Sequence, residues 1–119
     1  MVKLLCFLKR KPGMSLEEFN RHWKESHGTL IAGLPKLARH IVRYEQHRRL
    51  PGYDHLGTPG YDGIAVQWFH SVDDFMAFVA EPDYMEHIFP DEDRFLDRGG
   101  LVWMITEEPT VVIDGPTRR

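Results

Sequence analysis

The sequence contains a single cysteine, Cys6, among 119 residues. One thiol cannot form a disulfide within the chain, so the class of small secreted domains that disulfides hold together is excluded and a reducing compartment is expected. Cys6 lies in the apolar run of residues 2–8, where we expect a buried, unreactive thiol. This run is too short to cross a bilayer or to form a secretory leader. We therefore expect a cytoplasmic protein that does not enter a membrane.

Positive charge is not in excess either. Fifteen lysines and arginines are set against 18 acidic residues, so the net charge is −3 when the seven histidines are neutral. Such a chain has no overall positive field to attract nucleic acid. The basic residues form only two short runs, at 9–11 and 48–49, which we interpret as solvated positions at strand ends. Nucleic acid is therefore not an expected partner.

Sequence motifs for metals and cofactors are also lacking. No cysteine and histidine cluster has the spacing of a zinc site. His22 and His27 are five residues apart, about 140° of rotation on an α-helix, so both should not ligate one ion. The glycine-containing segment 57–60 carries no lysine to hold phosphate, and Ser26 beside His27 on one helix does not make an acyl-transfer triad. We expect neither a metal nor a cofactor.

What the sequence does contain is an ordinary globular composition, 42% hydrophobic and 28% charged, which predicts one domain over residues 1–119. Ser15 and Glu18 form a capping box that begins a helix, Pro35 is expected to stop that helix, and Ser71 caps a second one. The predicted strands cover 2–9, 40–48, 63–69 and 101–106. The predicted helices cover 16–27 or 16–33 and a stretch that begins at 72, with short helical pieces at 83–89 and 91–96. Pro82 either ends the helix that begins at 72 or begins a new turn.

The order of these elements is strand, helix, strand, repeated once. It predicts an α+β fold of the ferredoxin-like split βαβ kind, in which two helices cover one face of an antiparallel sheet. The uncovered face of such a sheet is normally polar. Here the first, third and fourth predicted strands carry large apolar side chains at both odd and even positions, and therefore on both faces of the sheet. Trp103 and Met104 on the fourth strand are an example.

A monomer rarely leaves an apolar patch of that size exposed. We therefore expect a homodimer in which the two sheets pack face to face as a dimeric α/β barrel, with the tail 110–113 reaching toward the partner. In the other interpretation, the loop 49–62 and the tail cover part of this face.

The motifs resemble those of the EthD family. Residues 10–19, followed by His22-Trp23 and by the segment 26–30, are similar to its opening, in which a Lys/Arg-Pro-Gly turn leads into a helix that ends in a His-Gly-Pro-Leu-type motif. The segments 62–69 and 91–97 resemble the family's third strand and its acidic Arg-Phe-Leu-Asp segment. Thr29 stands where the family commonly has proline, which affects only the helix end.

The resemblance implies a dimeric α/β barrel with a small apolar cavity in each protomer. The family includes proteins of ether-fuel degradation and decarboxylases of aromatic polyketides, and its more distant barrel relatives are cofactor-free cyclases, isomerases and monooxygenases. The family alone therefore does not determine a reaction.

His27 is the strongest candidate for catalysis. It lies within about 40° of Trp23 on the apolar stripe of the first helix, where a buried imidazole must be hydrogen-bonded. It is either a structural tie to a backbone carbonyl or a general acid/base, and the resemblance, in which this position carries the motif histidine, adds weight to the second role. His22 projects roughly 120° from the stripe, at its edge or in solvent. Tyr44 and His47 lie on opposite faces of the second strand, and either could be a second acid/base.

A flat substrate should contact aromatic and amide side chains. Gln67, on an otherwise apolar strand face, could orient a carbonyl or a phenol, although cross-strand hydrogen bonding is the alternative. Aromatic side chains at such spacing are also typical of an ordinary core. The candidates for substrate binding are Trp23, Gln67, Trp68, Tyr84 and Trp103.

These residues favour a cofactor-independent enzyme that acts on a small apolar, aromatic or polyketide-like molecule. The chemistry would be acid/base catalysis by histidine, in a decarboxylation, cyclisation or isomerisation. Two alternatives remain open. One is a cofactor-free monooxygenase, in which the activated substrate itself reduces oxygen; the other is a non-catalytic ligand carrier or accessory protein of an oxygenase or degradation pathway.

Overall fold

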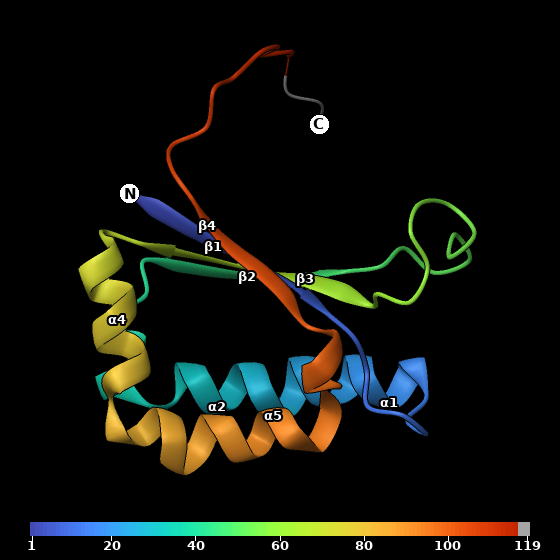
Figure 1. The fold of residues 1–119 in the computed structure, drawn as a ribbon, viewed down its shortest axis with the longest axis horizontal. Helices are drawn as coiled ribbons and strands as arrows, with labels where there is room; N and C mark the ends of the chain where they lie inside the picture. Colours follow the sequence, from blue (N-terminus) through green and yellow to red (C-terminus); the bar gives the residue numbers. More distant parts are fainter. Residues whose placement is uncertain (117–119) are drawn as a thin grey trace.

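The alternating and apolar segments of the sequence form a four-stranded sheet. In the computed structural model, which describes residues 1–116, the strands are antiparallel and lie in the order β2-β3-β1-β4 (Figure 1). Their bounds are within about three residues of those predicted, and β3 agrees at both ends. The strands are β1 (Val2–Leu8), β2 (Arg43–Arg48), β3 (Gly63–Phe69) and β4 (Val102–Thr106).

Two helical rods cover one face of this sheet (Figure 1). The first consists of α1 (Leu16–Arg21), the π-helical segment η1 (His22–Gly28) and α2 (Thr29–Ala32), without a break. The second consists of the π-helical segment η2 (Tyr84–Ile88) and α5 (Phe89–Phe95). At one end of the rods stands α4 (Val72–Ala80). This is the expected ferredoxin-like α+β arrangement.

Both predicted N-caps are confirmed. Ser15 Oγ accepts a hydrogen bond from the Glu18 N–H at 3.0 Å, and Ser71 Oγ accepts one from the Asp74 N–H at 3.2 Å. Each hydroxyl satisfies a donor that has no partner within its own helix.

Pro35 differs from its predicted role, and Pro90 lies where two separate helical pieces were expected. The first rod ends at Ala32, and Pro35 instead begins the short helix α3 (Pro35–Ala38). Pro90 lies in the first turn of α5, so the predicted break between two helical pieces is absent. Pro35 lies in the first turn of α3, where its missing N–H would have had no helical partner anyway, whereas Pro90 lies within the continuous second rod, where η2 changes to α5.

The core lies between the sheet and the rods. One cluster surrounds Trp23 and Phe95, and a second surrounds Phe69 and Phe78. The cavity described below takes lining residues from both clusters. The rods are therefore anchored at their two ends while space remains between them and the middle of the sheet.

The outer sheet face, on the side away from the rods, is apolar at its centre. Strand register places on this face Leu5, Phe7, Ile64, Val66, Trp68, Val102 and Met104. Phe7 is 38% exposed, Val102 49% and Met104 59%. The sequence prediction of apolar side chains on both faces is thus confirmed.

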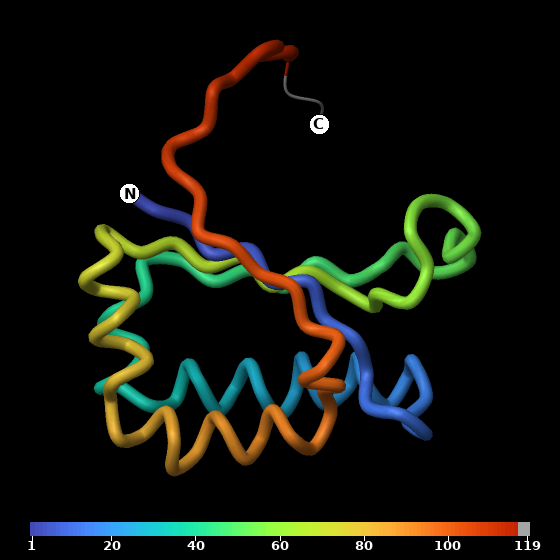
Figure 2. The backbone as a smooth tube through the Cα atoms, viewed as in Figure 1, coloured from blue at the N-terminus to red at the C-terminus, as the bar shows by residue number. Residues whose placement is uncertain are grey.

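The C-terminal tail leaves the domain beyond β4, on the side opposite the rods (Figure 2). Val111, Val112 and Ile113 are 67%, 88% and 85% exposed. The tail therefore does not cover the outer sheet face of its own chain. From the loop 49–62, Tyr61 contacts the Phe7 ring. Phe7, Val102 and Met104 nevertheless stay exposed on this face.

Candidate active site

A cavity of about 270 Å³ lies between the inner face of the sheet and the helical rods. Most of its wall is apolar, from β1, β3, β4, α4 and the two rods. Its polar side chains include His27 on η1, Tyr44 on β2, Gln67 on β3, Tyr84 with Glu92 on the second rod, and Arg98, which follows that rod. A few polar groups converging in a small apolar cavity are typical of a small-molecule site.

His27 is held at one ring nitrogen by a buried carboxylate. Its Nδ1 lies 2.7 Å from Asp91 Oδ2, and the His22 Nε2 lies 3.0 Å from Asp91 Oδ1. His27 is 6% and Asp91 3% exposed. Because Asp91 occupies Nδ1, the nitrogen of His27 that remains for a ligand in the cavity is Nε2.

The π-helical segment brings these two histidines to one partner. An α-helix would separate residues five apart by about 140°, but the i→i+5 hydrogen bonds of η1 put such residues nearly in line. His22 and His27 therefore both reach Asp91, and both rings pack against Phe95, with centroids at 4.8 and 4.9 Å. The predicted position of His22, at the stripe edge or in solvent, is corrected accordingly: it is a second partner of Asp91, 21% exposed.

The surroundings of His27 favour its neutral form over its protonated form. Loss of hydration lowers the pKa of the imidazole below its ordinary value, and the nearby His22 adds to this, while the hydrogen bond and charge of Asp91 oppose it. The direction is toward a neutral ring that donates its Nδ1–H to Asp91. Such a ring exposes a basic Nε2 to the cavity, the arrangement required of a general base.

Tyr44 presents a hydrogen-bond donor. Its hydroxyl oxygen accepts from Trp23 Nε1–H at 3.2 Å and from the Gln46 amide at 3.3 Å. With both acceptor positions used, the O–H itself is left to donate. Burial raises the pKa of this phenol, so it is a neutral donor and not a base. A carbonyl or developing oxyanion of a ligand is the natural acceptor.

Gln46 joins this donor to the π-helical segment. Its amide also donates to the Trp23 carbonyl at 2.8 Å, at the start of η1. A Cβ at position 28 would lie 3.0 Å from Gln46 Nε2, so glycine at this position leaves room for the amide. The irregular helix and the orientation of Tyr44 are thus coupled through one side chain.

A second polar group lies on the wall formed by α5. Glu92 Oε1 accepts a hydrogen bond from the Tyr84 hydroxyl at 2.9 Å. Arg98, in the short helix η3 (Arg98–Gly100), approaches the same oxygen at 3.8 Å. Its guanidinium is already bound to Asp93 at 2.6 Å and to the Phe89 carbonyl at 2.7 Å, so it stabilises the wall and is not free for a ligand.

The cavity brings together most of the predicted site residues. Of the four catalytic candidates, His27 and Tyr44 line it. Of the substrate-binding candidates, Trp23, Gln67, Tyr84 and Trp103 also line it.

Three predicted site residues do not line the cavity: His22, which contacts Asp91 as described above, and two residues on the outer sheet face. His47 is on the outer sheet face, 55% exposed, and pairs with Glu45 at 2.8 Å, because the face of β2 that turns inward is that of Tyr44 and Gln46. Trp68 is on the outer face as well, between Lys3 and Arg43, whose cationic groups lie 5.0 and 5.7 Å from its ring. Neither His47 nor Trp68 can contact a ligand held between the sheet and the rods.

Sequence reasoning missed Asp91, Glu92 and Gln46 as functional residues. The available signal was the acidic run 91–93 between two aromatic residues, Phe89 and Phe95, on a helix that must bury one side. An acidic residue on the buried side of such a helix needs a cationic or hydrogen-bonding partner. Its partner lies 64 positions away in the sequence, which no local pattern indicates.

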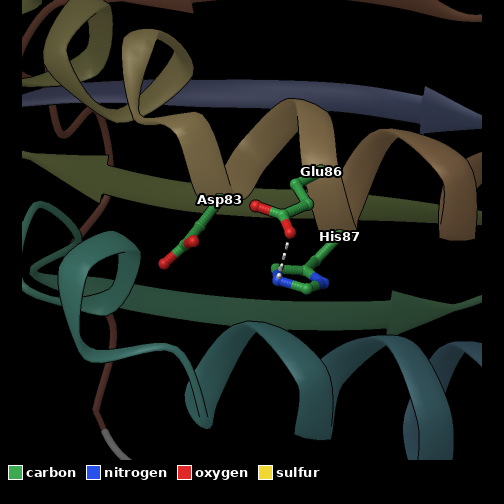
Figure 3. Close-up of side chains that lie close together, drawn as sticks. All are labelled: Asp83, Glu86 and His87. Atoms are coloured by element: carbon green, nitrogen blue, oxygen red, sulfur yellow. Dashed lines mark ion pairs between the residues drawn. The ribbon is translucent and has the colours of Figure 1, made fainter.

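A further group of possible ligands lies outside the cavity. Asp83, Glu86 and His87 have donor atoms within 4.8 Å of one another near the start of the second rod (Figure 3). Glu86 and His87 are exposed, and the Glu86–His87 ion pair spans 3.9 Å. Exposed acidic groups of this kind are common without a cation, so we assign it no function. Among residues 1–116, no helix is long and apolar enough to cross a membrane.

The fold and the cavity define a class: an α+β protein of ferredoxin-like fold with a small ligand cavity between sheet and helices. Residues 11–99 match the family model described as the EthD domain. The chain therefore belongs to the EthD family, as its motifs indicate.

Two curated relatives are fungal dehydratases. The conidial pigment biosynthesis dehydratase EthD of Metarhizium robertsii is 27% identical over 107 residues, which cover 80% of this chain and 75% of the relative. The dehydratase aurZ of Gibberella zeae is 26% identical over 106 residues, 82% of this chain and 70% of the relative.

Three solved structures share the fold. An EthD family protein of Bacillus halodurans has a TM-score of 0.67 at 17% identity, over 92% of this chain and 99% of the other. A dimeric protein of ferredoxin-like fold from Bacteroides fragilis has a TM-score of 0.66 at 17% identity, over 90% and 95%. SnoaB, a cofactor-independent oxygenase of Streptomyces nogalater, has a TM-score of 0.63 at 12% identity, over 95% and 97%. These identities establish the fold alone.

Proposed function

We propose that this protein is a cofactor-independent enzyme that acts on a small apolar, aromatic or polyketide-like molecule by acid/base chemistry. The observation that carries the proposal is the buried His27–Asp91 pair, at 2.7 Å, in a cavity that also receives the Tyr44 hydroxyl. The two fungal relatives named as dehydratases, one of them in pigment biosynthesis, support a reaction of this general kind.

In the proposed mechanism, the ligand carbonyl accepts a hydrogen bond from Tyr44. His27 Nε2 removes a proton from the carbon next to that carbonyl, and the resulting enolate oxygen is stabilised by the same phenol. Asp91 holds the imidazole in one orientation and stabilises the imidazolium that forms. Proton removal next to a carbonyl begins isomerisation, cyclisation and elimination of water. In a decarboxylation His27 Nε2 would instead take the proton of the carboxylic acid, CO₂ would leave as the C–C bond breaks, and the imidazolium would return that proton to the carbanion.

The proposal is tested by hydrogen exchange in D₂O with 2-tetralone, a two-ring ketone with acidic hydrogens beside its carbonyl. The wild-type protein, with no added cofactor and under nitrogen, should accelerate deuterium incorporation measured by proton NMR. His27→Gln and Asp91→Asn should lower this rate by about 10²–10⁴-fold and about 10-fold or more respectively. His87→Gln, at an exposed histidine of the second rod, is the matched control and should leave the rate unchanged.

Three outcomes would contradict the proposal. Exchange by His27→Gln at the wild-type rate would remove His27 as the base. Binding of 2-tetralone without any exchange would favour a ligand carrier. Turnover that stops under nitrogen would favour the monooxygenase alternative.

We propose further that the protein works as a homodimer through the outer sheet face. Phe7, Val102 and Met104 are substantially exposed there in the single chain, and two copies packed sheet to sheet would remove this apolar surface from water. The dimeric relative of the same fold supports this assembly. We expect the exposed tail residues 111–113, which extend on that side of the sheet (Figure 2), to contact the partner.

A further inference from the structure

Glu92 is a buried carboxyl for which the mechanism above has no role. It follows Asp91 on α5, but the two side chains turn different ways: Asp91 meets η1, whereas Glu92 lines the cavity beside Tyr84. The Glu92 side chain is 15% exposed. A carboxyl in such a wall either serves the fold alone or exchanges a proton with the ligand.

The surroundings of Glu92 favour its protonated form. Burial is the main cause that raises the pKa of this carboxyl, and the neighbouring Asp93 and Asp91 on α5 add to it. The Tyr84 hydroxyl and Arg98 act in the opposite direction. Arg98 is shared with Asp93 and the Phe89 carbonyl, which limits the positive charge available to Glu92.

The other titratable groups near Glu92 are neutral at physiological pH. From the sheet these are Cys6 on β1, whose pKa burial raises to about 11, and Tyr44 on β2, whose pKa is also raised by burial. From η2 it is Tyr84, whose pKa is raised as well. One cavity therefore holds two groups with opposite tendencies: His27 toward its basic form and Glu92 toward its acidic form. Such a pair is the arrangement that assigns a base and an acid.

We propose that Glu92 is the general acid that complements His27, and that the substrate class is a β-hydroxy ketone that loses water. This inference rests on the proposed function, because it requires His27 as the base. In the reaction His27 Nε2 takes the proton from the carbon between the carbonyl and the carbinol. The C–O bond of the carbinol breaks, and Glu92 gives its proton to the departing hydroxyl, so that water leaves and a C=C bond remains. The proton on His27 then returns to the Glu92 carboxylate through water, and no oxidant or reductant is consumed.

Tyr84 is the positioning residue for this acid. Its hydroxyl donates to Glu92 Oε1, so the other oxygen, Oε2, is the one left to carry and deliver the proton. The hydroxyl would also stabilise the carboxylate that remains after proton transfer.

The test uses 3-hydroxy-1-tetralone, whose dehydration yields fluorescent 1-naphthol. Glu92→Gln keeps the shape and the acceptor for Tyr84 but cannot give up a proton. This variant should eliminate water about 10²–10⁴-fold more slowly than the wild type, yet exchange the hydrogens of 2-tetralone within about threefold of the wild-type rate. Glu25→Gln, at an exposed glutamate of η1, is the matched control and should change neither rate.

The pH profile gives a second readout. In the wild type kcat/KM should fall at acid pH as His27 is protonated and at alkaline pH as Glu92 ionises, and Glu92→Gln should lose the alkaline limb. Tyr84→Phe should keep the alkaline limb but shift the pH at its midpoint. A merely structural role of Tyr84 would leave that midpoint unchanged.

Each result separates this inference from the proposed function. Loss of elimination in Glu92→Gln with retained exchange supports it. Elimination by Glu92→Gln at a rate within about threefold of the wild type overturns the acid assignment and leaves His27 as base. Exchange without any elimination by the wild type overturns the substrate class, and loss of both activities in Glu92→Gln shows a structural role and overturns the assignment as well.

Discussion

The His27 imidazole and the Asp91 carboxylate form a buried pair, with Nδ1 and Oδ2 2.7 Å apart and with His22 on the other carboxylate oxygen at 3.0 Å. They come from different helical rods, so the pair also ties η1 to α5. One carboxylate therefore orients the proposed base and holds the cavity wall together. This dual role leads to the first prediction.

Asp91→Asn should lower the free energy of unfolding by about 1–3 kcal/mol, because one amide oxygen cannot replace a carboxylate shared by the buried His27 and the half-buried His22. Urea unfolding followed by circular dichroism is the measurement. Asp54→Asn, at an exposed loop position, is the control and should be nearly neutral. An unchanged midpoint in Asp91→Asn would mean that the pair contributes nothing to holding the rods together.

The lowered pKa of His27 predicts how the contribution of this residue to the free energy of unfolding changes with pH. The folded protein disfavours the protonated ring, so this contribution is fully present above the ordinary histidine value of 6.5 and is lost as the pH falls below it toward the folded pKa. Unfolding free energies of the wild type and His27→Gln, measured between these limits, should therefore converge as the pH falls. A difference that widens toward acid pH would show that Asp91 outweighs burial and raises the pKa instead.

Met104→Asp should dissociate the proposed dimer, because it would bury an unpaired charge between the two sheets. Light scattering should give about 28 kDa for the wild type, twice 13.9 kDa, and a smaller or unfolded species for the variant. Met85→Asp is a matched control: Met85 on η2 is 59% exposed, as Met104 is, but lies on a helical rod. A wild-type particle of 13.9 kDa at micromolar concentration would refute the sheet-to-sheet dimer.

Gly63→Ala should destabilise the protein by about 1–3 kcal/mol through overpacking. A Cβ at position 63 would lie 2.6 Å from the Trp23 ring and 2.9 Å from the His47 carbonyl, so the indole must shift and its bond to Tyr44 must weaken. Activity should fall along with the urea midpoint. Gly99→Ala, whose nearest neighbour is Asp97 Oδ1 at 3.6 Å, should be tolerated, and equal effects at the two glycines would exclude this explanation.

The sequence by itself determined the order and type of the main elements. Ser15 and Ser71 begin helices because their hydroxyls satisfy backbone donors next to them in the chain, and such short-range bonds can be inferred from spacing alone. Trp103 and Met104 on opposite parities of β4 likewise indicated two apolar sheet faces, since strand alternation is a local property. The family motifs pointed to His27 in the same way.

Only the tertiary structure decided how the site is assembled. The π-helical form of η1 puts His22 and His27 on one side, and its Trp23 carbonyl is bound by Gln46 from a strand that comes later in the chain. Helical periodicity assumed 3.6 residues per turn and therefore placed His22 wrongly. The choice between Tyr44 and His47 depended on which face of β2 turns toward the rods. Asp91 and Glu92 acquire their roles from contacts with η1 and Tyr84 on η2, made by packing, which no local pattern in the sequence specifies.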